Sequence, residues 1–113
     1  MTNIRFFTTP EGKFTGFQAE GHAGYAKRGE DIVCAGISTL IQTTALGLEK
    51  LVEAGLHKKV RQKKSLFLCM LTCENSEEKK EKAHLLLGSM YLGLTELAKE
   101  YDQYLCVSLK EVD

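Results

Sequence analysis

Apolar residues recur at intervals of three, four and seven along two long segments, which is the spacing of one buried helix face. In the first segment they are Val33, Ile37, Leu40, Ile41, Leu48, Leu51 and Val52, and in the second they are Ala83, Leu86, Leu87, Met90, Leu94, Leu97 and Tyr101. We expect the first helix to begin near Ile32, with Asp31 as its N-cap and Gly55 as a left-handed cap at its end. Asn75 and Glu78 resemble a capping box that opens the second helix.

Shorter segments carry the alternating or continuous apolar pattern of strands, at residues 4–9, 13–20, 58–64, 66–73 and 104–109. Thr9 to Gly12 reads Thr-Pro-Glu-Gly, a turn signal that joins the first two strands in a hairpin. The weak alternation of 58–64 indicates an edge strand, and the apolar run 66–73 indicates a central one. The order ββαββαβ predicts a single α+β domain over residues 1–113, a mainly antiparallel sheet with two helices packed on one face.

The 15 basic and 15 acidic residues balance, so no overall field draws the protein to nucleic acid or to an anionic membrane. The residues Lys58, Lys59, Arg61, Lys63 and Lys64 form a basic cluster that could contact RNA. Lysines on an exposed edge strand also discourage unwanted strand pairing, and we favour that solvated role. Direct binding of nucleic acid is therefore not expected.

The first residues lack a basic segment followed by an apolar run, and no 18 consecutive residues are apolar, so we expect a cytoplasmic protein with no membrane contact. The same features predict that the four cysteines are reduced. Cys69, Cys73 and Cys106 are expected to be small core residues. Cys69 and Cys73 lie about 13 Å apart along a strand, too far to share one ion, so neither a metal nor another cofactor is expected.

The candidate chemistry lies between the first hairpin and the first helix. His22 follows the second predicted strand and Cys34 is the third residue of the predicted helix, with Gly21, Gly24 and Gly29 along the connection. Unsatisfied amides and the helix dipole favour the thiolate form of Cys34, so these two residues are the parts of a cysteine nucleophile and its base. The alternative is a buried structural cysteine with an unrelated surface histidine.

In the catalytic interpretation, Cys34 attacks a carbonyl and His22 delivers a proton to the leaving group. The backbone N–H groups of Cys34 and Ala35 are the nearest candidates for stabilising the oxyanion. Asp31 would orient His22 or bind substrate, although capping explains its position equally well. Ser38 lies one turn after Cys34 on the same helix face, where its hydroxyl would line the site or bond back to a carbonyl.

The pattern Gly-His-Ala from Gly21, the glycine-bearing loop, and Asp-Ile-Val-Cys-Ala-Gly-Ile-Ser ending at Ser38 resemble the ribosomal-processing cysteine protease family. The chain departs from the pattern at Ala26, where the family's loop has glycine, and the difference concerns the conformation of the loop. The resemblance implies a cysteine endopeptidase that removes the N-terminal extension of a ribosomal large-subunit protein, cutting just after a segment that contains aromatic residues. Tyr25 would offer an apolar contact to such a peptide.

The resemblance also implies a homodimer, and an apolar strip on the second helix around Leu85, Tyr91 and Leu92 would give it a physical basis. The same strip could equally be core. A different class of function is a non-catalytic ribosome-associated protein that binds through the basic edge strand. A thiol redox or acyl-transfer enzyme ranks last, because the chain has no Cys-x-x-Cys pair and no cofactor motif.

Overall fold

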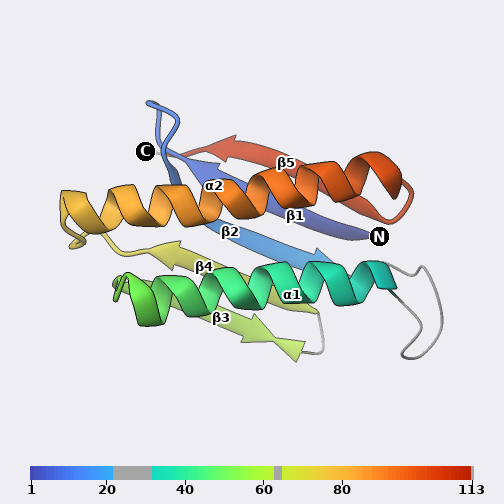
Figure 1. The fold of residues 1–113 in the computed structure, drawn as a ribbon, viewed down its shortest axis with the longest axis horizontal. Coiled ribbons are helices and arrows are strands. Elements are labelled where there is room, and N and C mark those ends of the chain that lie inside the picture. The colour runs from blue at the N-terminus through green and yellow to red at the C-terminus, as the bar shows by residue number, and fades with distance from the viewer. Residues whose placement is uncertain (22–31, 63–64, 113) are drawn as a thin grey trace.

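The chain forms one sheet of five strands with two helices across one of its faces (Figure 1). The computed structural model describes residues 1–21, 32–62 and 65–112. Its elements are β1 (Thr2–Thr8), β2 (Phe14–Gly21), α1 (Ile32–Leu46), a π-helical turn η2 (Gly47–Leu51), β3 (Leu56–Arg61), β4 (Leu66–Leu71), α2 (Glu77–Glu100) and β5 (Leu105–Glu111). The predicted order ββαββαβ is confirmed.

The strands lie in the order β3-β4-β2-β1-β5. Three neighbouring pairs are antiparallel, while β1 and β5 are parallel, so the sheet is mixed and mainly antiparallel. As predicted, β3 is an edge strand and β4 an inner one. The β1–β2 hairpin turns where the Gly12 N–H donates to the Thr9 carbonyl at 2.9 Å, with Gly12 at φ 85°, a conformation that glycine adopts without strain.

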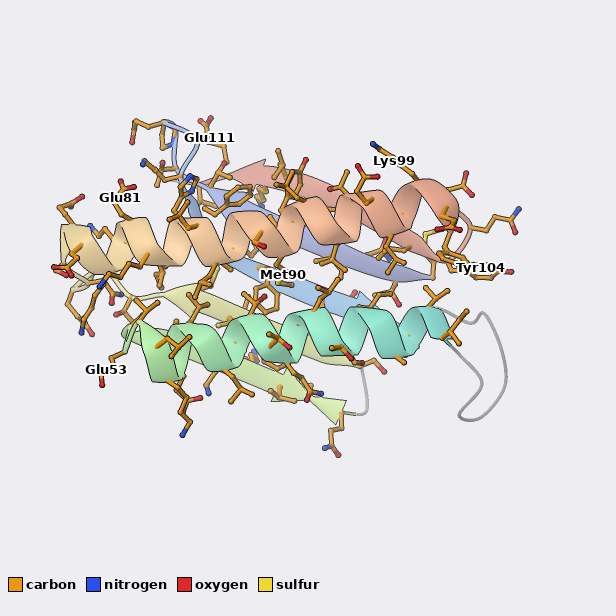
Figure 2. The ribbon with its side chains drawn as sticks, in the orientation of Figure 1. Glu53, Glu81, Met90, Lys99, Tyr104 and Glu111 are labelled. Atoms are coloured by element: carbon orange, nitrogen blue, oxygen red, sulfur yellow. The ribbon has the colours of Figure 1, made fainter. Side chains whose placement is uncertain are left out.

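The two helices run antiparallel to each other over the same face of the sheet (Figure 1). Their buried stripes meet the apolar side chains of the strands, and Met90 of α2 lies between the helices (Figure 2). The fully buried large side chains at the centre of this layer are Phe6, Phe17, Ile4, Leu48, Leu87, Met90, Leu94, Leu105, Val33 and Cys69. The core therefore lies between sheet and helices, and the opposite face of the sheet has no helix over it in the described part of the chain.

Helix ends differ from the sequence expectations. Ser76, not Asn75, is the N-cap of α2, and its hydroxyl accepts the Lys79 N–H. Asn75 is buried instead, where its side chain bonds the N–H and carbonyl of Gly55 at 2.8 and 2.9 Å. The left-handed residue after the first helix is Glu53, with φ 55°, rather than Gly55. A cap depends on which side chain reaches the backbone, and two adjacent polar residues look alike in sequence.

Three expected core positions are on the surface. Leu51 is 81% exposed, since the π-helical turn at the end of the first helix rotates it off the buried stripe. Cys73 is exposed because β4 ends at Leu71, and Cys106 is exposed because it alternates with the buried Leu105 on edge strand β5. Cys69 alone of those three cysteines is buried, as predicted, and all four cysteines are thiols.

The helical stretch Ile32–Leu51 is long and apolar enough to pass a length and composition test for a membrane span. A core helix passes the same test, and here Val33, Ile37, Ile41 and Leu48 pack against the sheet and α2. The apolar character of this helical stretch is therefore explained by its place in the core of the domain.

Candidate active site

A groove of about 260 Å³ lies beside the first turns of α1, where the ends of four strands converge under the helix. It is lined by Cys34, Ile37, Ser38, Ile41 and Gln42 of α1, by Ala19, Glu20 and Gly21 of β2, by Val60 and Arg61 of β3, by Leu66 and Phe67 of β4, and by Thr2, Gln62 and Ser65. The groove thus brings together segments that are distant in the sequence.

Cys34 is the third residue of α1, as the sequence predicts. Its neighbours Val33 and Ile37 are buried and fix the helix against the sheet, while Cys34 itself is half-buried at the boundary between core and groove. The thiol therefore has a packed side and a side that faces the groove. A sulfur in the first turn of a helix lies near the positive end of the helix dipole, the environment in which cysteine nucleophiles occur.

Gly21 ends β2 at the same groove. Its N–H donates to the Ser65 carbonyl at 3.1 Å, and its φ of 94° lies in the region that glycine adopts without strain. A Cβ at this position would overlap the Met1 carbonyl oxygen. The end of β2 is thus held between Met1 and Ser65, and glycine is required there by both space and conformation.

The structure brings together Gly21, Cys34 and Ser38 among the predicted site residues. Ser38 is exposed one turn after Cys34. The side chain of Ala35 lies on the other side of α1, in the depression between the helices, so Ala35 could contribute only its backbone to the groove. His22, Tyr25 and Asp31 lie outside the described residues, and the pairing of His22 with Cys34 remains a prediction.

Sequence reasoning missed the strand residues that form the floor of the groove. Val60 and Phe67 are register partners on β3 and β4, and together with Ile37 and Ile41 they make this floor apolar. Phe67 also stacks on Phe17, with ring centroids 5.6 Å apart, which fixes the floor against the core. No spacing in the sequence reveals this part of the floor, because it is formed by strand pairing across the sheet.

Cys69 provides a contrast with Cys34. It is fully buried beneath the helices, and burial raises the pKa of its thiol to about 11, an effect that Lys58 opposes and Glu49 reinforces. Cys69 therefore stays protonated at neutral pH and acts in packing. Of the four cysteines, Cys34 is the one that lines the groove. Within the described residues no group of three His, Cys, Asp or Glu side chains could hold a metal ion.

A helix-start thiol at a groove with an apolar floor, on an α+β scaffold, is the arrangement of a hydrolase that uses a cysteine nucleophile. A family model described as cysteine protease Prp matches residues 1–106. The chain belongs to this family and is a cysteine protease.

Relatives agree with this assignment. The ribosomal processing cysteine protease Prp of Bacillus subtilis is 26% identical over 98 residues, covering 81% of this chain and 82% of the relative. The ribosomal processing protease Prp of S. aureus, solved with a covalently linked product peptide, has a TM-score of 0.85 and 25% identity, over 97% of this chain and 100% of that one. SMU.848 of Streptococcus mutans has a TM-score of 0.82 and 25% identity, over 99% of this chain and 96% of that one.

Proposed function

We propose that Cys34 and His22 carry out the peptide hydrolysis. The Cys34 thiolate attacks the scissile carbonyl carbon, and the tetrahedral intermediate collapses with cleavage of the C–N bond while His22 gives its proton to the leaving amine. Water, deprotonated by His22, then attacks the thioester and releases the new carboxylate and the Cys34 sulfur. The observation that carries the proposal is the position of Cys34 at the groove, together with Gly21, the residue directly before His22.

The oxyanion of the intermediate needs hydrogen-bond donors in the same place. The Cys34 N–H belongs to the first turn of α1, at the positive end of the helix dipole, and the Ala35 N–H follows it. Both are main-chain donors beside the attacking sulfur, which is the arrangement that stabilises a developing oxyanion. We assign them this role.

Three further residues are assigned supporting roles. Ser38 is exposed at the groove one turn from Cys34, where its hydroxyl can bond the main chain of a bound peptide. Asp31 is assigned the role of orienting His22 or contacting substrate. Tyr25 offers an apolar contact to the peptide.

The substrate that we propose is the N-terminal extension of a ribosomal large-subunit protein, cut after a segment containing aromatic residues, in the cytoplasm. The relatives from Bacillus subtilis and S. aureus are named ribosomal processing proteases, which supports this choice. The apolar floor formed by Ile37, Ile41, Val60 and Phe67 suits an aromatic or large aliphatic side chain next to the cleaved bond.

A homodimer is supported by two leucines two turns apart on α2. Leu85 is 71% and Leu92 66% exposed, and they lie along one side of the helix. Tyr91 does not belong to this strip, because its ring packs edge-on against Phe6 with centroids 5.3 Å apart. Sedimentation at micromolar concentration should give a dimer for the wild type and a monomer for Leu85→Ser/Leu92→Ser, while a monomeric wild type would remove the claim.

The proposal is tested by incubating a candidate ribosomal precursor with wild-type protein, Cys34→Ala and His22→Ala, and measuring masses. We expect one new N-terminus with the wild type and none with either variant, with circular dichroism showing that all three are folded. Cleavage by Cys34→Ala at the wild-type rate would refute the mechanism. A peptide with its aromatic residues scrambled should be a poor substrate, and equal cleavage would contradict the proposed specificity.

A further inference from the structure

The sheet face opposite the helices carries a regular grid of side chains. Strand register places three rows across it, and residues paired across neighbouring strands point to the same side. In the order β3-β4-β2-β1-β5 the rows are Arg61-Leu66-Glu20-Asn3-Cys106, Lys59-Leu68-Gln18-Arg5-Ser108 and His57-Met70-Gly16-Phe7-Lys110. We call this surface the open face.

Cations dominate the open face although the chain is neutral overall. Arg5, Lys59, Arg61 and Lys110 are all exposed there, and Glu20 is the one carboxylate in the grid. The zero net charge conceals this asymmetry. Lys58, a neighbour of Lys59 in the sequence, points to the helix side, where it meets Glu49 at 3.4 Å.

The cations of the two faces differ in their partners. Elsewhere in the described residues five lysines form ion pairs with glutamates: Lys13 with Glu81, Lys58 with Glu49, Lys80 with Glu77, Lys82 with Glu78 and Lys99 with Glu96. Lys79 instead donates to the Glu53 carbonyl, and Lys50 has no ion pair with any described residue. Figure 2 shows Glu81 and Lys99 on α2, away from the open face. Among residues 1–21, 32–62 and 65–112, the four cations of the open face form no ion pair. Their charge is available to an anionic partner.

Between the cationic columns lies apolar surface. Leu66, Leu68 and Met70 are half-buried along β4, and Phe7 is half-buried on β1 beside Lys110. Flat apolar and aromatic side chains on a sheet, flanked by cations, are the features with which sheet surfaces hold single-stranded RNA: bases stack on the rings while phosphates meet the cations. A second copy packed symmetrically on this face would bring like charges together, which disfavours that occupant.

We propose that the open face binds single-stranded RNA, with Arg5, Lys59, Arg61 and Lys110 contacting phosphates and with Phe7 and the β4 side chains contacting bases. The choice of RNA as the polyanion rests on the proposed function, because a protease acting on a ribosomal protein meets its substrate beside RNA. The open face lies on the side of the sheet opposite α1, which carries Cys34. Its end row reaches the rim of the groove through Arg61, Leu66 and Glu20, whereas Arg5, Lys59 and Lys110 do not line the groove, so RNA held by these three cations leaves Cys34 accessible.

The test measures binding of a fluorescein-labelled 12-nucleotide RNA of mixed sequence to the full-length Cys34→Ala protein by anisotropy between 50 and 300 mM KCl. With about four phosphate contacts, log K should fall against log salt with a slope of about −3. The variant Arg5→Gln/Lys59→Gln/Lys110→Gln should bind about a hundredfold more weakly at 0.1 M salt, with a slope near −1.

The matched control is Lys80→Gln/Lys82→Gln/Lys99→Gln, which removes the same number of charges from ion-paired positions on α2. It should bind RNA as the wild type does. Equal weakening of RNA binding in the two triple variants would overturn the proposal. So would a failure of the protein with an unaltered open face to bind the RNA at 50 mM salt. Phe7→Leu should lower affinity at least about fivefold through lost stacking, and unchanged affinity would contradict base contact.

Two readouts separate this proposal from its alternatives. With Cys34 retained, the open-face triple variant should cleave a short peptide substrate at the wild-type rate, so failure of RNA binding and failure of proteolysis are distinguishable. Sedimentation should show the same oligomeric state for both triple variants. If the open-face variant alone dissociates a dimer, the surface is a subunit interface and the RNA proposal is wrong.

Discussion

Gly21 and Cys34 are thirteen positions apart in the chain, and they line the same groove. The first ends β2 and the second lies in the first turn of α1, so the connection between them starts and finishes at one place. This convergence supports a site made from His22, which directly follows Gly21, and from the Cys34 thiol. It also explains why small changes at the end of β2 should affect catalysis.

Gly21→Ala should lower both stability and activity. The substitution places a side chain at φ 94° and against the Met1 carbonyl, so unfolding free energy should fall by about 1–3 kcal/mol. Gly12→Ala is the matched control, because Gly12 has φ 85° but nothing within 4 Å of its added Cβ. Urea unfolding should show a larger loss for Gly21→Ala, and only this variant should lose activity at a temperature where both are folded. Equal losses in the two variants would mean that crowding at the end of β2 has no role.

Replacing the nucleophile should separate activity from stability. Cys34→Ala and Cys34→Ser should each lower turnover at least about a thousandfold, because neither side chain supplies a thiolate. Unfolding free energy should change by less than about 1 kcal/mol, since Cys34 is only half-buried. Peptide cleavage and thermal unfolding measure the two quantities. A variant that loses activity only because it unfolds would not support the assignment, and one that retains activity would exclude it.

The four thiols should react with iodoacetamide in an order that follows their positions. At pH 7.5 we expect Cys34 to react first, the exposed Cys73 and Cys106 more slowly, and Cys69 only after unfolding. Peptide mapping at successive times gives the order. Labelling of Cys69 in the folded protein at the rate of Cys106 would contradict the burial described.

Burial of Cys69 also predicts a loss of stability at alkaline pH. Below about pH 9 its thiol is protonated in folded and unfolded chains alike, so it contributes no pH dependence. As pH rises from 9 towards 11, the unfolded thiol ionises while the folded one keeps its proton, and the unfolded state gains relative stability. Between pH 8 and 10 wild type should therefore lose about 1 kcal/mol more than Cys69→Ala in urea unfolding. Parallel pH profiles would contradict the raised pKa.

Asn75 should be the most sensitive polar residue outside the site. Its side chain accepts the Gly55 N–H at 2.8 Å and donates to the carbonyls of Gly55 and Thr72 at 2.9 Å each, joining the start of α2 to the segment before β3. Asn75→Ala leaves the Gly55 N–H without its acceptor and removes the side-chain donor to both carbonyls, although the Gly55 carbonyl still accepts the Thr72 N–H at 3.0 Å, and it should cost about 2–4 kcal/mol. Ser76→Ala removes only the N-cap and should cost about 1 kcal/mol. A larger loss of unfolding free energy in Ser76→Ala than in Asn75→Ala would contradict these assignments.

How much of this was predictable depends on the range of the interactions involved. The start of α1 at Ile32 and the burial of Ile37 and Ile41 follow from local periodicity, so the sequence predicts them correctly. The parallel pairing of β1 with β5 joins opposite ends of the chain and leaves no local signal.

The residues of the site also separate into those with a local sequence signal and those without one. The motif predicts Cys34, Gly21 and Ser38, whereas Val60 and Phe67 enter the groove only through the register of β3 with β4. The exposure of Cys106 follows from alternation on an edge strand whose outer face carries no helix from the described residues, which composition does not reveal. The basic cluster divides between two faces for the same reason, because alternation sends Lys58 to one side and Lys59 to the other.

In the proposed mechanism the Cys34 sulfur forms a covalent acyl intermediate with the peptide substrate. It is measured by acid quenching of wild-type protein and Cys34→Ala within the first turnover on a precursor peptide, followed by intact mass and peptide mapping. We predict an added acyl mass on the peptide that contains Cys34, absent in Cys34→Ala. An acyl group mapped to another residue, or the same adduct in Cys34→Ala, would contradict the account.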